Sequence, residues 1–377
     1  MHRKGIYIIK KIGLSVMLVT LLTTVCFAND TIEPKIIMEQ SNMVKGERTE
    51  SNDKQIFTST QVVEIALKNS KDVKGKEKDL DRASEVYEDT QIVLGTYIPS
   101  LIQAKKACEI NQEWAEKNLA TTKESIEDLV INSINNINIL KLKMNVNDLK
   151  ITNSKKELEM MKLKKDLGLE SQYNYDNFKK EHEDLMKEHE KLKIDMKNSY
   201  VVLEEMFGLE NIKQYDVQNK IAYNLLQEID IDTLIRKELA SNPNIWYLEK
   251  NVELKELAVK LHEYNKAGDS YAVKEIDVTK AEIDLDQAKT NLEYSMRVAY
   301  NQIKKIEEQH EQLQLKLQKL QNSLKTAKVN YDAGLIIELD VKKIEAGVKE
   351  LEASIKELEM NHEKQVKYLH KPYLQQK

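Results

Sequence analysis

Residues 330–341 read NYDAGLIIELDV, and the Gly-Leu-Ile-Ile break inside this stretch decides the fold. It interrupts a proline-free segment, 244–371, that otherwise has the composition of helix. Gly334 permits the positive φ that ends a helix, and Asp340 can cap a helix that starts directly afterwards. The stretch therefore predicts the tip of a helical hairpin with two antiparallel arms.

Both arms around this tip carry residues of one register at alternating steps of four and three. The arm before the tip has Ala299, Ile303, Ile306, His310, Leu313, Leu317, Leu320, Leu324, Ala327 and Tyr331, and the return arm has Val341, Ile344, Val348, Leu351, Ile355, Leu358 and His362. Such spacing is typical of a coiled-coil seam. The first arm, expected over 272–332, would be roughly 90 Å long.

A second copy of this pattern lies in the N-terminal half of the chain. One constant shift aligns Leu158, Gly168, Leu169, Leu185 and Leu192 with Leu324, Gly334, Leu335, Leu351 and Leu358. Internal duplication predicts an all-α chain of two tandem repeats, each a long antiparallel coiled-coil hairpin. Hairpins of this length cannot bury both flanks alone, so we expect them to pack laterally.

The predicted parts follow in chain order. They are a signal peptide (1–28), a flexible N-terminal segment (29–57), repeat 1 (58–210), a linker (211–230), repeat 2 (231–371) and a C-terminal tail (372–377). The first part is basic, then apolar, and ends at Ala28 as signal peptides do, the alternative being a retained membrane anchor. No second run of 18 apolar residues follows, so we expect no later bilayer-spanning helix.

Charge, cysteine content and the lack of catalytic motifs argue against several classes of function. Without the signal peptide the chain has 54 basic and 63 acidic residues, a net charge of −9, which disfavours a nucleic-acid partner. Cys26 lies in the signal peptide, so Cys108 has no partner for an intrachain disulfide. The sequence contains no phosphate loop, cysteine pair or nucleophile elbow. We therefore expect no enzyme activity, no cofactor and no metal site.

Two histidines in the apolar register are unusual. His310 and His362 are equally far from the tip in sequence, so an antiparallel hairpin would hold them level. Their equivalents in repeat 1 are Met144 and Met196. One interpretation is a layer that responds to pH or to soft metals, because imidazole titrates near pH 6.5. The alternative is a polar layer that fixes the register, or simple core filling.

Several ordered motifs resemble the TolC family of outer-membrane efflux proteins over about residues 58–371. Tyr331-Asp332-Ala333-Gly334 is followed by Asp340-Val341, repeat 1 has Leu-Gly-Leu-Glu-Ser at 167–171, and VVLEEMFGLEN at 201–211 resembles the end of a family repeat. The resemblance implies a homotrimer forming a hollow α-helical barrel. Its tips would dock on a membrane-fusion adaptor that leads to an inner-membrane pump.

The resemblance places the docking tips at Gly168, Leu169, Ser171, Gly334, Leu335 and Asp340. It implies a component of an envelope efflux or export system that forms a conduit or scaffold. The chain departs from the family at Ile336 and Ile337, where polar residues are usual. The alternative function is a structural coiled-coil protein of the envelope or the extracellular space that has lost transport.

A second departure concerns the strands that cross the outer membrane in this family. Only residues 95–100 and 264–271 separate the helices at the corresponding points, and a membrane strand needs about 9–11 residues. We therefore expect the β-barrel part to be reduced or absent. The expected location is beyond the cytoplasmic membrane, in the cell envelope or on the extracellular face.

Overall fold

A computed structural model describes residues 56–92, 98–208, 216–218, 223–264 and 268–375. The predicted signal peptide and most of the predicted flexible segment lie outside these residues. Repeat 1 comprises α1 (Ser59–Asn69), α2 (Lys71–Ile92), α3 (Pro99–Asp166) and α4 (Gln172–Phe207). Repeat 2 comprises α5 (Ile231–Ser241), α6 (Pro243–Lys260), α7 (Tyr271–Asp332) and α8 (Glu338–His370), followed by the 3-10 helix η2 (Pro372–Gln375). The prediction of two tandem helical hairpins is confirmed.

Local sequence explains where the short helices begin. Thr58 caps α1 by accepting from the backbone N–H of Gln61, and Asp230 caps α5 in the same manner. Asn242 caps α6, whose first residue is Pro243, a position where proline costs no hydrogen bond. In repeat 1, Ser70 separates α1 from α2 at the place that Asn242 takes in repeat 2.

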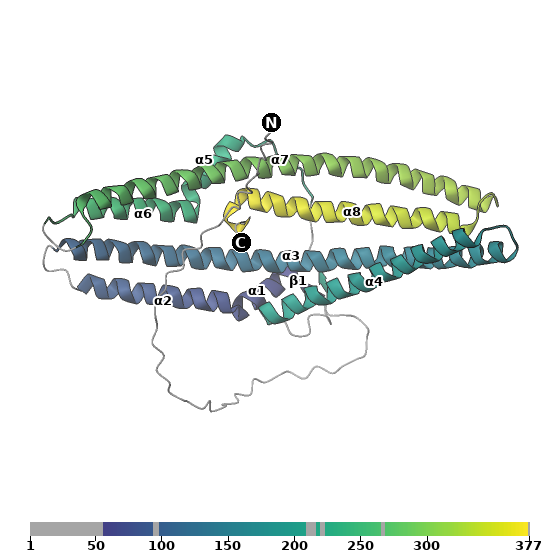
Figure 1. Cartoon of the computed structure of the whole chain (residues 1–377), viewed down its shortest axis with the longest axis horizontal. Helices are drawn as coiled ribbons and strands as arrows, with labels where there is room; N and C mark the ends of the chain where they lie inside the picture. The colour runs from purple at the N-terminus through teal and green to yellow at the C-terminus, as the bar shows by residue number, and fades with distance from the viewer. Residues whose placement is uncertain (1–55, 93–97, 209–215, 219–222, 265–267, 376–377) are drawn as a thin grey trace, which may run out of the picture. The chain divides into compact units, whose positions relative to one another are not determined.

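The helices form a single layer rather than a closed bundle (Figure 1). Toward the hairpin tips the lateral order is α4, α3, α8, α7, and toward the other end it is α2, α3, α6, α7. Helix α3 therefore lies in the middle of the layer along its whole length. The two edges are α7 on one side and α2 with α4 on the other.

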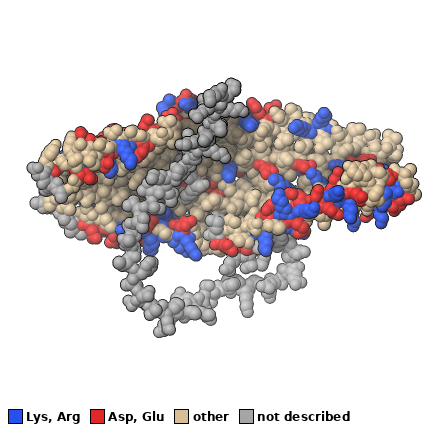
Figure 2. All heavy atoms as spheres, viewed as in Figure 1, with Lys and Arg blue, Asp and Glu red and all other residues tan. Residues whose placement is uncertain are grey.

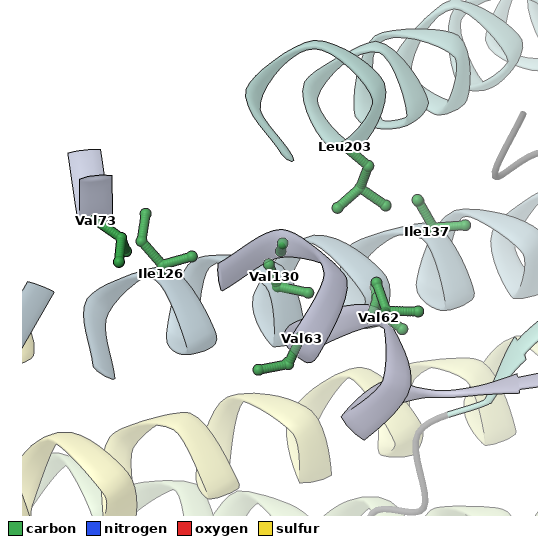
Figure 3. Close-up of a cluster of buried hydrophobic side chains, with 9 residues drawn as sticks. Val62, Val63, Val73, Ile126, Val130, Ile137 and Leu203 are labelled. Atoms are coloured by element: carbon green, nitrogen blue, oxygen red, sulfur yellow. The ribbon is translucent and has the colours of Figure 1, made fainter. Parts of the chain in front are cut away.

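Each repeat has its own hydrophobic core, and the two cores use equivalent residues. The first core, drawn in Figure 3, includes Val62, Val63, Ile126, Val130, Ile137 and Leu203. The second core has, at the equivalent positions and in the same order, Leu234, Ile235, Leu292, Met296, Ile303 and Leu369. The duplication seen in the sequence thus extends to the buried side chains that fix α1 or α5 against its hairpin.

A feature that the sequence did not predict joins the start of repeat 1 to the linker. Strand β1 (Ile56–Thr58) pairs in parallel with β2 (Asp216–Gln218), with Phe57 opposite Val217. Three-residue strands carry too little periodicity to be recognised in a sequence. Parts of the two segments expected to be too short for a strand pair, 95–97 and 265–267, lie outside the described residues.

The two hairpins meet along α3 and α8 through regularly spaced ion pairs. Lys143 Nζ lies 2.8 Å from a Glu357 oxygen, Lys150 Nζ lies 2.6 Å from Glu350, and Lys343 Nζ lies 2.5 Å from Glu157. Each step of seven residues along α3 matches a step of seven backward along α8. Exposed pairs of this kind contribute at most about 1 kcal/mol each, so their main effect is to fix the register that brings both tips to one end.

The end of α8 is fastened to α3 through a buried carboxylate. Asp128 accepts hydrogen bonds from the Tyr368 hydroxyl at 2.9 Å and from Asn132 at 2.8 Å, and Lys367 Nζ lies 3.1 Å away. One turn earlier on α3, Glu124 accepts from the Tyr373 hydroxyl and pairs with Lys371 at 2.9 Å. These contacts join the C-terminal end of repeat 2 to the middle of repeat 1.

The Asp128 clamp, formed by the contacts of Asp128 with Asn132, Lys367 and Tyr368, predicts that the free energy of unfolding falls at alkaline pH. Burial and the hydrogen bond to Asp128 raise the pKa of Tyr368 to about 12. A tyrosine whose pKa is higher in the folded state stabilises the fold below about pH 10 and loses that contribution as pH rises toward 12. We expect Tyr368→Phe to reduce the fall in the free energy of unfolding over this window, measured by urea unfolding at each pH. An unchanged pH profile would contradict the role assigned to Tyr368.

Candidate functional site

The two hairpin tips have nearly identical backbone geometry. Gly168 has φ 72° and Gly334 has φ 73°, which places both in the left-handed region. At tip 1 the Leu169 N–H donates to the Lys164 carbonyl, and at tip 2 the Leu335 N–H donates to the Asn330 carbonyl, both at 2.8 Å. These bonds close a Schellman motif, which satisfies carbonyls left open at a helix end.

The return helices begin differently at the two tips. Ser171 is the N-cap of α4, and its hydroxyl accepts from the Asn174 N–H at 3.1 Å. The N-cap of α8 is Ile337, which has no side-chain acceptor. Asp340 was expected to cap this helix, but it lies inside its first turn, where its carboxylate accepts from the Ile337 N–H at 3.3 Å. An isoleucine here forfeits a cap bond worth about 1 kcal/mol.

Apolar side chains project into solvent at both tips. Leu169 and Leu335 are 74% and 73% exposed, and Ile337 is 48% exposed. Around them lie Leu163, Leu167 and Tyr173 at tip 1 and Val329 and Tyr331 at tip 2, all exposed. On the face shown in Figure 2, dense mixed charge follows α4 near tip 1, whereas the visible surface of α7 near tip 2 is mostly uncharged. The tips therefore share a backbone shape but differ in their surroundings.

Replacing Gly334 with alanine tests the tip geometry. No atom lies within 4 Å of the added Cβ, so the cost comes only from the positive φ, at about 1 kcal/mol. We expect Gly334→Ala to lower the free energy of unfolding by this amount in urea titrations. The matched control is Gly75→Ala within α2, also without a close neighbour, which should stabilise by about 1 kcal/mol. Equal effects of one sign would contradict the geometry.

His310 and His362 lie at one level, and the linker covers them. The Tyr223 ring stacks on His310 with centroids 3.9 Å apart and tilts against His362 at 4.9 Å. His310 Nε2 is 3.3 Å from Glu359, and His362 Nε2 is 3.1 Å from Glu307. The arrangement is reciprocal, because each hairpin arm supplies one histidine and one glutamate.

Glu307 also holds the linker backbone. Its carboxylate accepts from the Leu226 N–H at 2.5 Å and from Lys304 Nζ at 2.9 Å. Burial alone would raise the pKa of Glu307, but the hydrogen bonds from Leu226, Lys304 and His362 lower it below its usual value. Burial, followed by the nearby Glu307 and Glu359, raises the pKa of Tyr223.

In repeat 1 the equivalent positions, Met144 and Met196, are half-buried. Among the described residues, no group of three or more His, Cys, Asp or Glu side chains is placed to hold a metal ion. Sequence reasoning identified the two histidines but missed Glu307, Glu359 and Tyr223. In the sequence, the two glutamates cannot be distinguished from the many other charged residues of the helices. Tyr223 lies in the predicted linker, which has no periodic pattern.

The edges of the layer are a second candidate interaction surface. On α7, Ile276, Ile283 and Tyr294 are 65%, 62% and 71% exposed. With 3.6 residues per turn, they lie opposite the buried stripe of Leu292, Met296 and Ile303. On the other edge, exposed apolar residues are Val86 on α2 and Tyr173, Met186, Ile194 and Val202 on α4. A helix that is apolar on two opposite faces is expected to have a neighbour on each.

The fold defines a class of protein: long paired helical hairpins arranged in one layer, with exposed apolar side chains along both edges. Within the described ranges, no helix is both long enough and apolar enough to cross a bilayer. No protein-family model matches the sequence, and no curated protein matches it.

Solved structures do match. The outer membrane protein VceC from Vibrio cholerae gives a TM-score of 0.60 at 12% identity, over 83% of this chain and 96% of that chain. The outer-membrane channel OprN gives 0.60 at 12% identity, over 83% and 89%. The Campylobacter jejuni CmeC outer membrane channel gives 0.57 at 13% identity, over 82% and 84%. The chain therefore has the fold of the TolC-type outer membrane channels, which the sequence motifs predicted.

Proposed function

We propose that this chain is a TolC-like component of an envelope export system, which assembles into a helical tube and docks by its hairpin tips on a membrane-fusion adaptor. The observation that carries the proposal is the open layer. Two apolar edges on one protomer differ from each other, so the α7 edge of one copy would meet the α2 and α4 edge of the next. Such head-to-tail contacts close into a ring when the rotation allows it.

A trimer is the assembly that the resemblance implies. The layer order supports a closed ring of copies, because α3 and α8 are flanked on both sides whereas α7 and α4 are each flanked on one. Three copies would give each edge helix its missing neighbour. The similar solved structures are described as outer membrane channels, which favours a conduit in the cell envelope as the setting of this assembly.

The tips provide the docking surface in this proposal. Ile337 stands at a helix start where serine, threonine, asparagine or aspartate stabilises best, and half of its side chain is exposed. An apolar residue in that position serves the isolated protomer poorly. A contact with an adaptor would bury it together with Leu335.

The test combines imaging with tip substitutions. End views of purified residues 29–377 by negative-stain electron microscopy should show rings with an open centre. The double variant Leu335→Glu and Ile337→Glu should keep the rings and lose at least tenfold in affinity for the adaptor of the same cell, measured by biolayer interferometry. Substitutions at exposed Lys349 and Glu352 on α8 serve as the control. Rings that bind no adaptor would favour the structural alternative.

A further inference from the structure

The two edges of the layer carry exposed apolar residues at the same level along the helices. Contacts that mark one level across the layer, in order from α4 to α7, are His189 with Asp148 at 3.0 Å, Lys150 with Glu350 at 2.6 Å, and Gly347 with Leu320. His189 on one edge is therefore level with Leu320 on the other, to within about one turn. Because α4 runs away from the tips and α7 runs toward them, Ile194 of α4 is level with Leu315 of α7.

Ile194 and Leu315 both point away from the layer. Their side chains are 58% and 61% exposed. On α7, Leu315 is followed at heptad spacing by Asn322 and Val329, which are also exposed, and this outward line lies opposite the seam that contacts α8. A ring formed by rotation about one axis does not shift neighbouring copies along that axis, so Ile194 of one copy would meet Leu315 of the next.

Charged residues on one flank of this contact are complementary. The exposed residues three positions after the outward line are Glu311, Gln318 and Lys325 on α7, and Glu183, Glu190 and Lys197 on α4. Equivalent flanks of two antiparallel helices face each other, and charges there set the choice and orientation of the partner helix. Lys325 falls opposite Glu183, and Glu311 falls opposite Lys197, each within one residue, or about 1.5 Å, of the same level.

These four charges are available for a neighbouring copy. In the part of the chain that the structure describes, Lys325, Glu311 and Lys197 have no ion pair. The Glu183 carboxylate lies 3.8 Å from Lys179, which is a long and weak contact between exposed groups.

The charge pattern also specifies one register. A shift of one heptad along the contact, in either direction, would bring Glu311 opposite Glu190 or Glu204. Like charges facing each other disfavour both shifts. Only the unshifted register gives two attractive pairs on this flank, and it is the register that the contacts across the layer predict.

The other flank carries less information. Four positions after the outward line, Lys305 is level with Glu205, which is attractive, and Lys319 is level with Lys191, which is not. The repulsion is reduced because Glu188 lies 3.7 Å from Lys191.

We propose that α7 of one copy packs antiparallel against α4 of the next, with Leu315 against Ile194 and with the ion pairs Lys325–Glu183 and Glu311–Lys197. The inference rests on the proposed tube and adds the contacts that select its neighbour. The apolar pair holds the two helices together, and the ion pairs fix their register. All copies then present their tips at one level.

Charge reversal on one edge and then on both edges tests the ion pairs. Glu311→Lys with Lys325→Glu on α7 should raise at least tenfold the concentration at which residues 29–377 dissociate. The measurement is light scattering during size exclusion at roughly 100 mM NaCl, where charges within about 10 Å still interact. Glu183→Lys with Lys197→Glu on α4 should have the same effect. The four changes together restore opposite charges and should return the dissociation concentration to that of the unsubstituted protein.

The matched control reverses one exposed pair on α8, a helix with a neighbour on each side, by Lys349→Glu with Glu352→Lys. It should leave dissociation unchanged, and circular dichroism should show the same helix content in every variant. If the unsubstituted chain assembles and the reversals on single edges assemble equally well, the ion pairs are wrong and the tube stands. The pairing is also wrong if the fourfold variant assembles no better than either edge variant. A single chain without substitutions would overturn the tube and this inference together.

Disulfide trapping tests the register independently. In a Cys108→Ser background, Ile194→Cys with Leu315→Cys should give covalent dimers and trimers on oxidation, because a disulfide needs Cα atoms within about 7 Å. Ile194→Cys with Val329→Cys keeps the outward line of α7 but moves one cysteine by two heptads, about 21 Å. This second variant should remain single chains on a denaturing gel. Equal crosslinking of the two variants would overturn the proposed register.

Discussion

Introducing two glutamates on the exposed face of α7, by Ile276→Glu and Ile283→Glu, is expected to dissociate the assembly into single chains. The two isoleucines are one heptad apart and more than 60% exposed in the isolated protomer. In the proposed ring they would lie against α2 or α4 of the next copy, and burying two unpaired carboxylates there costs several kcal/mol per interface. The readout is mass by light scattering after size exclusion.

The matched control introduces a glutamate at a hairpin tip, away from both edges of the layer. Leu169→Glu at tip 1 replaces a more exposed apolar residue with the same charge. It should leave the mass unchanged, and both variants should keep the helix content measured by circular dichroism. If the α7 variant retains the mass of the unsubstituted protein, α7 is not an edge of the interface.

Removing the carboxylate of Asp128 is expected to give the largest change in the stability of a single chain. Asp128→Ala leaves Lys367, Tyr368 and Asn132 without their shared partner, and Asp128 itself is 5% exposed. Loss of one member of a buried charged network costs about 3–5 kcal/mol, and the partial exposure of Lys367 places the expected value near the lower end. Urea unfolding monitored by circular dichroism measures it.

A control variant distinguishes the loss of the Asp128 clamp from the effect of removing any carboxylate from α3. Glu159→Ala removes a carboxylate from the same helix, but one whose side chain is exposed. Its effect should be within about 0.5 kcal/mol. The double variant Asp128→Ala and Tyr368→Phe should lose less than the sum of the two single variants, because the residues are in contact. Additive losses would contradict the hydrogen bond between them.

The repeated pattern made most of the fold predictable. Helix α7 was expected over 272–332 and runs from Tyr271 to Asp332, because a four-three register and a glycine are local signals. The same register identified both tips. It could not identify contacts between segments far apart in sequence, such as the α3 and α8 ion pairs, since lysine and glutamate occur on every exposed face.

The candidate sites were less predictable, because they also depend on contacts between residues far apart in the sequence. Asp128 reads as one more helix acid, and only its distance of 2.9 Å from a tyrosine 240 residues later distinguishes it. Asp340 was expected to be the cap of α8, but the helix begins two residues earlier, at Glu338.

The solution mass of residues 29–377, measured by light scattering during size exclusion, tests the central claim most directly. The open layer with two dissimilar apolar edges predicts a discrete closed assembly, and the resemblance to the TolC family implies that it contains three chains. We expect this particle to persist on dilution to micromolar concentration. A single chain at that concentration would contradict the proposed tube, because it would mean that the exposed faces of α7 and of α2 with α4 do not bind each other.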